Sequence, residues 1–114
     1  MGNSHEADKY FEWSRKSERR GDLQHALMQV EEAIRCRPGD TVFWSAKSQY
    51  LYDAEKYEDA VSAAKTAVHL NSKNYHAWAI QGMALTRLAK FIEAAACYRR
   101  SVEIKEDVGV FSLL

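Results

Sequence analysis

The side chains best suited to bind a metal or to attack a substrate are four histidines and two cysteines. The histidines are scattered along the chain: His5, His25, His69 and His76. None of them has a second metal-binding residue at the spacing of a zinc site. Cys36 and Cys97 lie far apart and match no metal or redox motif. We therefore expect no bound metal or other cofactor, and two reduced cysteines that pack as small apolar side chains.

Groups for covalent or phosphate chemistry are equally scarce. No serine stands in the tight turn that activates a nucleophile, and no glycine-rich loop could hold a phosphate. The sequence therefore predicts a protein that is not an enzyme.

Four basic residues gather at one point of the chain: Arg15, Lys16, Arg19 and Arg20. They could form a phosphate-binding patch, but Glu12 and Glu18 lie among them and the chain has a net charge of zero. Only Phe11 offers a ring on which a base could stack. We expect a solvated helix face and no nucleic-acid partner. An RNA-binding stack stays as an alternative, and it would lose affinity steeply with added salt.

A helical pattern dominates the chain. After residue 57 the apolar residues recur at spacings of three and four, which places them on one face of a helix: Val61, Ala64, Ala67, Val68 and Leu70. Similar runs begin 34 residues earlier, at Leu23, and 34 residues later, at Phe91. Because alanine has little bulk, this face must lie close to another helix. The chain therefore contains three copies of one helical motif.

Several columns recur in the three copies. The first helix of each copy has an aromatic residue near its start, at Tyr10, Trp44 and Trp78. A small residue follows at Ser14, Ser48 and Gly82. The second helix has a strictly small column at Ala26, Ala60 and Ala94. Over about 100 residues the sequence resembles the tetratricopeptide repeat family, whose period is 34 residues with two helices in each copy. The closing proline is present only as Pro38, and the turn glycine only as Gly21.

The resemblance implies an all-α fold, an α-solenoid of three antiparallel helix-turn-helix repeats that form a right-handed superhelix. The expected repeats are residues 7–40, 41–74 and 75–108, preceded by a disordered leader at residues 1–6. We expect helices at about residues 7–20, 23–36, 42–54, 56–70, 75–88 and 90–106, with Thr41 as an N-cap.

The family places first helices on a concave face, so the candidate binding residues are those of the first helices that the packed face does not use: Asp8, Phe11, Arg15, Glu18, Arg19, Val42, Ser45, Gln49, Tyr52, Asp53, His76, Ala79, Met83, Thr86 and Arg87. Some of these side chains can hold an apolar group and others can hydrogen-bond a backbone or an acid. The predicted peptide-binding groove is made of Phe11, Arg15, Gln49, Tyr52, His76, Met83 and Arg87.

A well-known use of the family is a basic clamp for the acidic carboxyl-terminal tails of heat-shock chaperones. The five clamp positions fall on Phe11, Arg15, Ala46, His76 and Ile80 in this sequence. Only Arg15 keeps a permanent positive charge, and alanine and isoleucine cannot donate a hydrogen bond to a carboxylate. We therefore do not expect a chaperone tail as the partner.

The end of the chain, residues 109–114, forms an apolar tail that is too short for another repeat. The last helix of a solenoid normally needs a polar outer face. The tail could fold back as a truncated capping segment, the natural protein could continue, or a second molecule could cover the patch. The third case makes a homodimer through Phe111, Leu113 and Leu114 the alternative function.

The composition agrees with a folded helical module. Of the 114 residues 46% are hydrophobic and one is a proline, which argues against a disordered chain. No run is long enough to cross a membrane and the amino terminus does not resemble a signal peptide, so we expect a cytoplasmic protein, with the nucleus as an alternative. The predicted function is a non-catalytic scaffold or adaptor that binds a peptide or helix of a partner protein in its concave groove.

Overall fold

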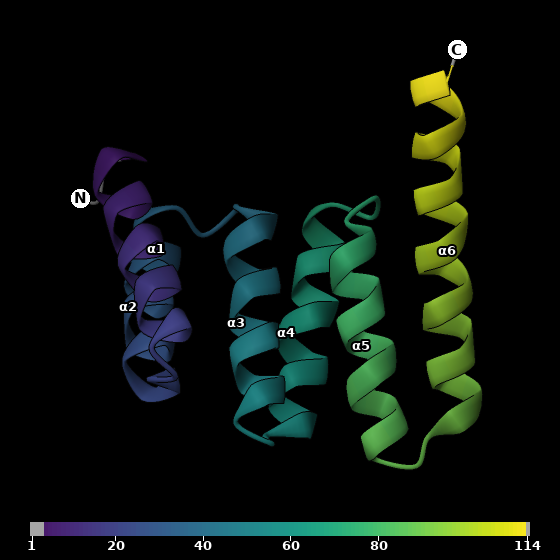
Figure 1. The fold of residues 1–114 in the computed structure, drawn as a ribbon, viewed down its shortest axis with the longest axis horizontal. Coiled ribbons are helices and arrows are strands. Elements are labelled where there is room, and N and C mark those ends of the chain that lie inside the picture. The colour runs from purple at the N-terminus through teal and green to yellow at the C-terminus, as the bar shows by residue number, and fades with distance from the viewer. Residues whose placement is uncertain (1–3, 114) are drawn as a thin grey trace.

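The computed structural model describes the backbone of residues 4–113 and the side chains of residues 5–107. Within that part the chain consists of helices alone, arranged as three antiparallel pairs in a row (Figure 1). The helices are α1 Ser4–Arg19, α2 Leu23–Cys36, α3 Thr41–Asp53, α4 Tyr57–Leu70, α5 Tyr75–Arg87 and α6 Phe91–Leu113. The expected all-α solenoid of helix pairs is confirmed. No helix in the described range is both long and apolar enough to span a membrane.

The inner helix boundaries agree closely with the periodicity. Helix α2 has the expected bounds, α4 and α5 each differ from expectation by one residue at one end, and α3 begins and ends one residue earlier than expected. The expected N-cap Thr41 is wrong, because Asp40 precedes it and its carboxylate accepts a hydrogen bond from the Val42 amide at 2.9 Å. Thr41 instead donates to the carbonyl of Ala67 at 2.7 Å and so ties α3 to α4.

The two outer helices are longer than expected. Helix α1 begins at Ser4, so residues 4–6 of the expected disordered leader are helical. Helix α6 continues to Leu113, so residues 109–113 extend the helix and do not form a separate tail. A single glycine such as Gly109 costs a helix only about 1 kcal/mol, which the hydrogen bonds of the continuing turns can offset. Residues 1–3 and Leu114 lie outside the described part of the chain.

Two tryptophans fix the connections between the repeats. The indole of Trp44 donates to the carbonyl of Pro38, and the indole of Trp78 donates to the carbonyl of Ser72, both at 2.9 Å. The two tryptophans occupy the same position in successive repeats, so the same residue type anchors both loops. The recurrent aromatic near the start of these first helices therefore holds the preceding turn against the helix that follows it.

Alanines let the helices of a pair approach closely. Ala26, Ala60 and Ala94, the small column of the second helices, are at most 2% exposed. Burial of small side chains leaves room for the ridges of the facing helix. The core divides into two clusters, one formed by α1, α2 and α3 and the other by α3, α4, α5 and α6, and both contact Trp44 and Leu27.

Candidate functional site

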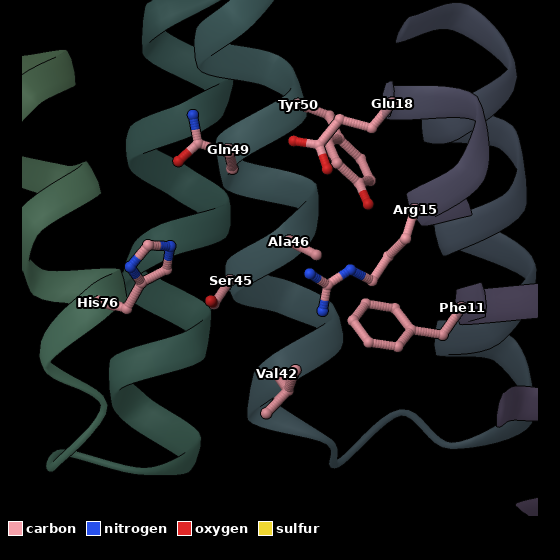
Figure 2. Close-up of a pocket in the computed structure, with 9 residues that line it drawn as sticks. All are labelled: Phe11, Arg15, Glu18, Val42, Ser45, Ala46, Gln49, Tyr50 and His76. Atoms are coloured by element: carbon pink, nitrogen blue, oxygen red, sulfur yellow. The ribbon is translucent and has the colours of Figure 1, made fainter. Parts of the chain in front are cut away.

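A pocket of about 330 Å³ lies between α1 and α3 and reaches the first turn of α5 (Figure 2). That volume is at the lower end of the range typical of ligand-binding clefts. The residues that line it are Phe11, Arg15, Glu18, Val42, Ser45, Ala46, Gln49, Tyr50 and His76. All of them belong to the first helices of the three pairs, so the pocket opens on the face that these helices share.

Bulky side chains bridge α1 and α3 at the base of this pocket. The ring of Phe11 packs on the ring of Phe43, with centroids 4.9 Å apart, and Phe43 is 2% exposed. Tyr50 reaches from α3 to α1, where its hydroxyl lies 3.3 Å from the Ser14 hydroxyl. These helices therefore meet through long side chains and are held apart, because aromatic rings occupy the space between the backbones.

Tyr50 has a structural role here. It is 2% exposed, and its burial raises the pKa of its hydroxyl, with a smaller contribution from the charge of Glu18. The hydrogen bond with Ser14 and the charge of Arg15 act in the opposite direction. The buried phenol, whose hydroxyl is paired with Ser14, supports the wall of the pocket.

The α1 wall of the pocket carries two opposite charges. Arg15 is exposed, and its guanidinium carbon lies 5.8 Å from the centre of the Phe11 ring. The Glu18 side chain is half-buried, and its carboxylate lies farther along α1, on the side of Tyr50 (Figure 2). Phe11, Val42 and Ala46 form an apolar floor next to these charges, which suits recognition of a segment with both apolar and charged side chains.

The opposite wall is polar and neutral or weakly basic. Gln49 projects from α3, where its amide donates to Asp53 at 3.0 Å and leaves its carbonyl oxygen available. His76 is exposed in the first turn of α5, a helix that begins at the N-cap Asn74. Asn74 holds that turn by accepting a hydrogen bond from the Ala77 amide at 3.1 Å.

The structure brings four of the seven predicted groove residues into this pocket: Phe11, Arg15, Gln49 and His76. The other three, Tyr52, Met83 and Arg87, do not line it. Arg87 donates through Nε to the Tyr52 hydroxyl at 3.2 Å, and its guanidinium also lies over the ring of Tyr57, at 5.8 Å from the centroid. This contact links α3, α4 and α5, so Tyr52 and Arg87 hold the second and third pairs together. The predicted self-association residues Phe111, Leu113 and Leu114 lie outside the described side chains.

Sequence reasoning missed five residues that line the pocket: Glu18, Val42, Ser45, Ala46 and Tyr50. Three of these belong to the wider candidate set of first-helix residues but not to the predicted groove: Glu18, Val42 and Ser45. Tyr50 has a signal in the columns, because the corresponding residues of the other repeats are Lys16 and Ala84. An aromatic side chain in one copy of a variable column can mark a place where helices are held apart.

A second hollow of about 390 Å³ lies between α2, α3 and α4. Its apolar part contains Leu27, Trp44 and Leu51, and charged side chains including Lys47 and Asp59 surround it. In the part of the chain with described side chains, no three His, Cys, Asp or Glu residues come together as a metal site requires.

The third pair matches a known family model, described as tetratricopeptide repeat, over residues 75–108. Tetratricopeptide repeat protein 33 of Xenopus laevis is 32% identical over 84 residues, which cover 74% of this chain and 33% of that protein. The Mus musculus protein of the same name is 30% identical over 81 residues, which cover 71% and 31%. The chain thus spans about a third of the length of these relatives.

Solved structures share the fold. The first TPR of Spaghetti (RPAP3), bound to the HSP90 peptide SRMEEVD, superposes with a TM-score of 0.90 at 24% identity, over 92% of this chain and 83% of that one. The Sgt2 TPR domain from Aspergillus fumigatus gives a TM-score of 0.88 at 21% identity, over 93% and 70%. The matched repeat, the relatives and the shared architecture lead to one conclusion: the chain belongs to the tetratricopeptide repeat family.

Proposed function

We propose that this chain is a non-catalytic interaction module that binds an extended segment of a partner protein in the pocket between α1 and α3. The observation that carries this proposal is the pocket itself, in which an apolar floor lies beside the charged groups of Arg15 and Glu18. Such a combination suits a peptide, which offers both apolar side chains and hydrogen-bonding backbone groups.

The packing of the pocket supports binding with a small loss of side-chain entropy in this chain. Phe43 and Tyr50 hold α1 and α3 apart, and both are 2% exposed. Since these side chains are already ordered, binding need not order them again. A ligand that contacts both α1 and α3 would gain affinity from this preorganisation.

The structural neighbours raise the question of chaperone peptides, because two of them were solved with the HSP90 peptide SRMEEVD. At the corresponding positions of this chain, Ile80 is 1% exposed and so cannot reach a ligand, and Ala46 has no donor. Among the residues that the structure describes, Arg15 is the one guanidinium or ammonium group that lines the pocket. We propose that the partner is a protein segment other than an acidic chaperone tail.

A capture experiment tests the site. A tagged chain with Arg15→Glu and Gln49→Ala should lose the partner that the wild type retains from a cell extract, because both polar walls are altered. The matched control Met83→Ala replaces the residue that corresponds to Gln49 in the third repeat and should keep capture. All three proteins should show the same melting curve by circular dichroism. Unchanged capture by the double variant would place the site elsewhere.

Self-association is a second candidate function, and one observation on α6 favours it. Phe91 and Val102 are 64% and 53% exposed, whereas the corresponding Tyr57 and Val68 in α4 are half-buried because α5 packs against α4. A second copy could cover the exposed face of α6. Light scattering over a range of concentrations should then show a dimer that Val102→Asp dissociates, and a constant monomer mass would exclude this function.

A further inference from the structure

The α1 wall of the pocket carries charges that no ion pair satisfies within the part of the chain that the structure describes. Neither Arg15 nor Glu18 forms an ion pair with another described residue. Arg37, by contrast, pairs with Asp40 at 2.9 Å. Figure 2 shows the two side chains of the pocket directed to different parts of it, with the guanidinium nearer to Phe11 and the carboxylate nearer to Tyr50. Each is therefore available to a charge on a ligand.

The order of these groups along α1 is fixed by the helix. Phe11, Arg15 and Glu18 follow one another at intervals of about one turn, which corresponds to a rise of about 6 Å and then about 4.5 Å. In an extended chain, alternate side chains point to the same side at intervals of about 6.5 Å. An extended segment beside α1 therefore places every second side chain opposite the next of these three residues.

We propose that the pocket selects an extended segment in which an acidic side chain stands between an apolar one and a basic one, with one residue between neighbours. This inference rests on the proposed function and names the chemistry of the partner. The apolar side chain packs on Phe11 and Val42, the acidic one pairs with Arg15, and the basic one pairs with Glu18. Because the acidic residue is in the middle, the rule holds for either chain direction.

The same arrangement disfavours a segment that is acidic throughout. A second carboxylate on the segment would face Glu18, and two negative charges close together repel each other. A segment that is basic throughout would face Arg15 with the same effect. The pocket is therefore selective for charge order, since each wrong charge meets a repulsive group as well as losing an attractive one.

Four labelled peptides test this inference. Two have glutamate in the middle, Leu-Ser-Glu-Ser-Lys and its reverse, and two have lysine in the middle, Leu-Ser-Lys-Ser-Glu and its reverse. Fluorescence anisotropy with the wild-type chain should show that the better glutamate-centred peptide binds about tenfold more tightly than either lysine-centred peptide, as expected for charge-assisted hydrogen bonds at an open site. The preference should weaken with added salt.

Exchange of the two charges supplies the decisive variant. The chain with Arg15→Glu and Glu18→Arg should prefer the lysine-centred peptides instead. The control exchange Glu12→Arg with Lys16→Glu reverses an exposed pair on the same helix, whose charged atoms lie 3.6 Å apart, and should keep the wild-type preference. Circular dichroism should show that both variants remain folded.

Two results would overturn the inference. One is a wild-type chain that binds the four peptides equally or binds none of them, and the other is an exchanged variant that keeps the wild-type preference. Either result leaves the proposed function standing if Arg15→Glu with Gln49→Ala still abolishes capture of the partner. Loss of the proposed function is recognised separately, by capture that this double variant does not change.

Discussion

The junction between the first and second repeats differs from the junction between the second and third. In the first junction Phe43 and Tyr50 fill the space between α1 and α3, and a pocket remains beside them. In the second junction the corresponding residues are Ala77 and Ala84, both fully buried, and α5 packs against α3 as well as α4. The same helix pair is thus repeated with large side chains at one junction and small ones at the other.

The difference shows how a repeat array can form a pocket without a change of fold. Aromatic side chains separate two first helices and leave room for a ligand, whereas alanines bring them together and close that room. At the second junction the space is closed further by the contact of Arg87 with Tyr52. Binding is therefore expected at the junction with the larger side chains.

Removal of an aromatic side chain from the first junction should have the largest effect. Phe43→Ala is expected to lower the free energy of unfolding by about 3–5 kcal/mol, because it deletes a ring that is fully packed between α1 and α3. Urea denaturation measures this change. The control Phe91→Ala removes an exposed ring and should change stability by less than about 0.5 kcal/mol. A loss below 1 kcal/mol for Phe43→Ala would show that the ring does not hold the junction.

The reverse substitution at the second junction comes next. Ala77→Phe places at the third repeat the ring that Phe43 supplies to the second, and Ala77 is fully buried. Overpacking should cost about 1–3 kcal/mol of unfolding free energy. The exposed Ala95→Phe is the matched control, expected within about 0.5 kcal/mol of the wild type. If Ala77→Phe were neutral, the two junctions would not differ in the space they leave.

A smaller effect is expected inside the third pair, where a glycine leaves space for a large side chain on the facing helix. A β-carbon on Gly82 would lie 3.1 Å from two ring carbons of Tyr98, while the corresponding pair in the first repeat is Ser14 with Val30. Gly82→Ser should therefore be more favourable in a Tyr98→Val background than in the wild type, by about 1 kcal/mol. Thermal unfolding of the two single variants and the double variant measures this coupling, and strict additivity would show that Tyr98 does not require the glycine.

The smallest effect concerns the turns within the pairs. Gly21, Glu55 and Ala89 occupy the same turn position in the three repeats and have φ angles of 78°, 63° and 61°. Residues other than glycine are strained in this conformation by about 1–2 kcal/mol. Glycine also increases the conformational entropy of the unfolded chain, which offsets part of the strain that is relieved. Ala89→Gly should therefore raise the free energy of unfolding by about 0.5–1 kcal/mol. Gly21→Ala should lower it, and a rise for both variants would contradict this account of the turn.

The sequence predicted the helix pairs well because their causes are local. The recurrent apolar spacing and the small column at Ala26, Ala60 and Ala94 act over a few residues and repeat in each copy. The ends of the chain were predicted less well. Helix α6 has no strong stop signal after Glu106, so its continuation to Leu113 depends on the balance of helix propensities and could not be inferred from the repeat period.

The candidate site was predicted only in part, because column reasoning treats the three repeats as equivalent. Phe11, Arg15, Gln49 and His76 line the pocket, but Tyr52 and Arg87, which lie in other columns of the first helices, contact each other at the second junction. What distinguishes the junctions is the size of the side chains that meet across them. That pairing depends on the three-dimensional packing of α1 against α3 and of α3 against α5, which a single sequence does not display.

Photo-crosslinking at equivalent positions tests the central claim most directly. Benzoylphenylalanine is introduced in place of Gln49 in the pocket, in place of Met83 one repeat later, and in place of Ser62 in the second hollow, and each protein is irradiated with the same captured partner. A crosslink to the partner is expected from position 49, and none is expected from position 62 or 83. Crosslinks from position 62 or 83 without one from position 49 would contradict the claim.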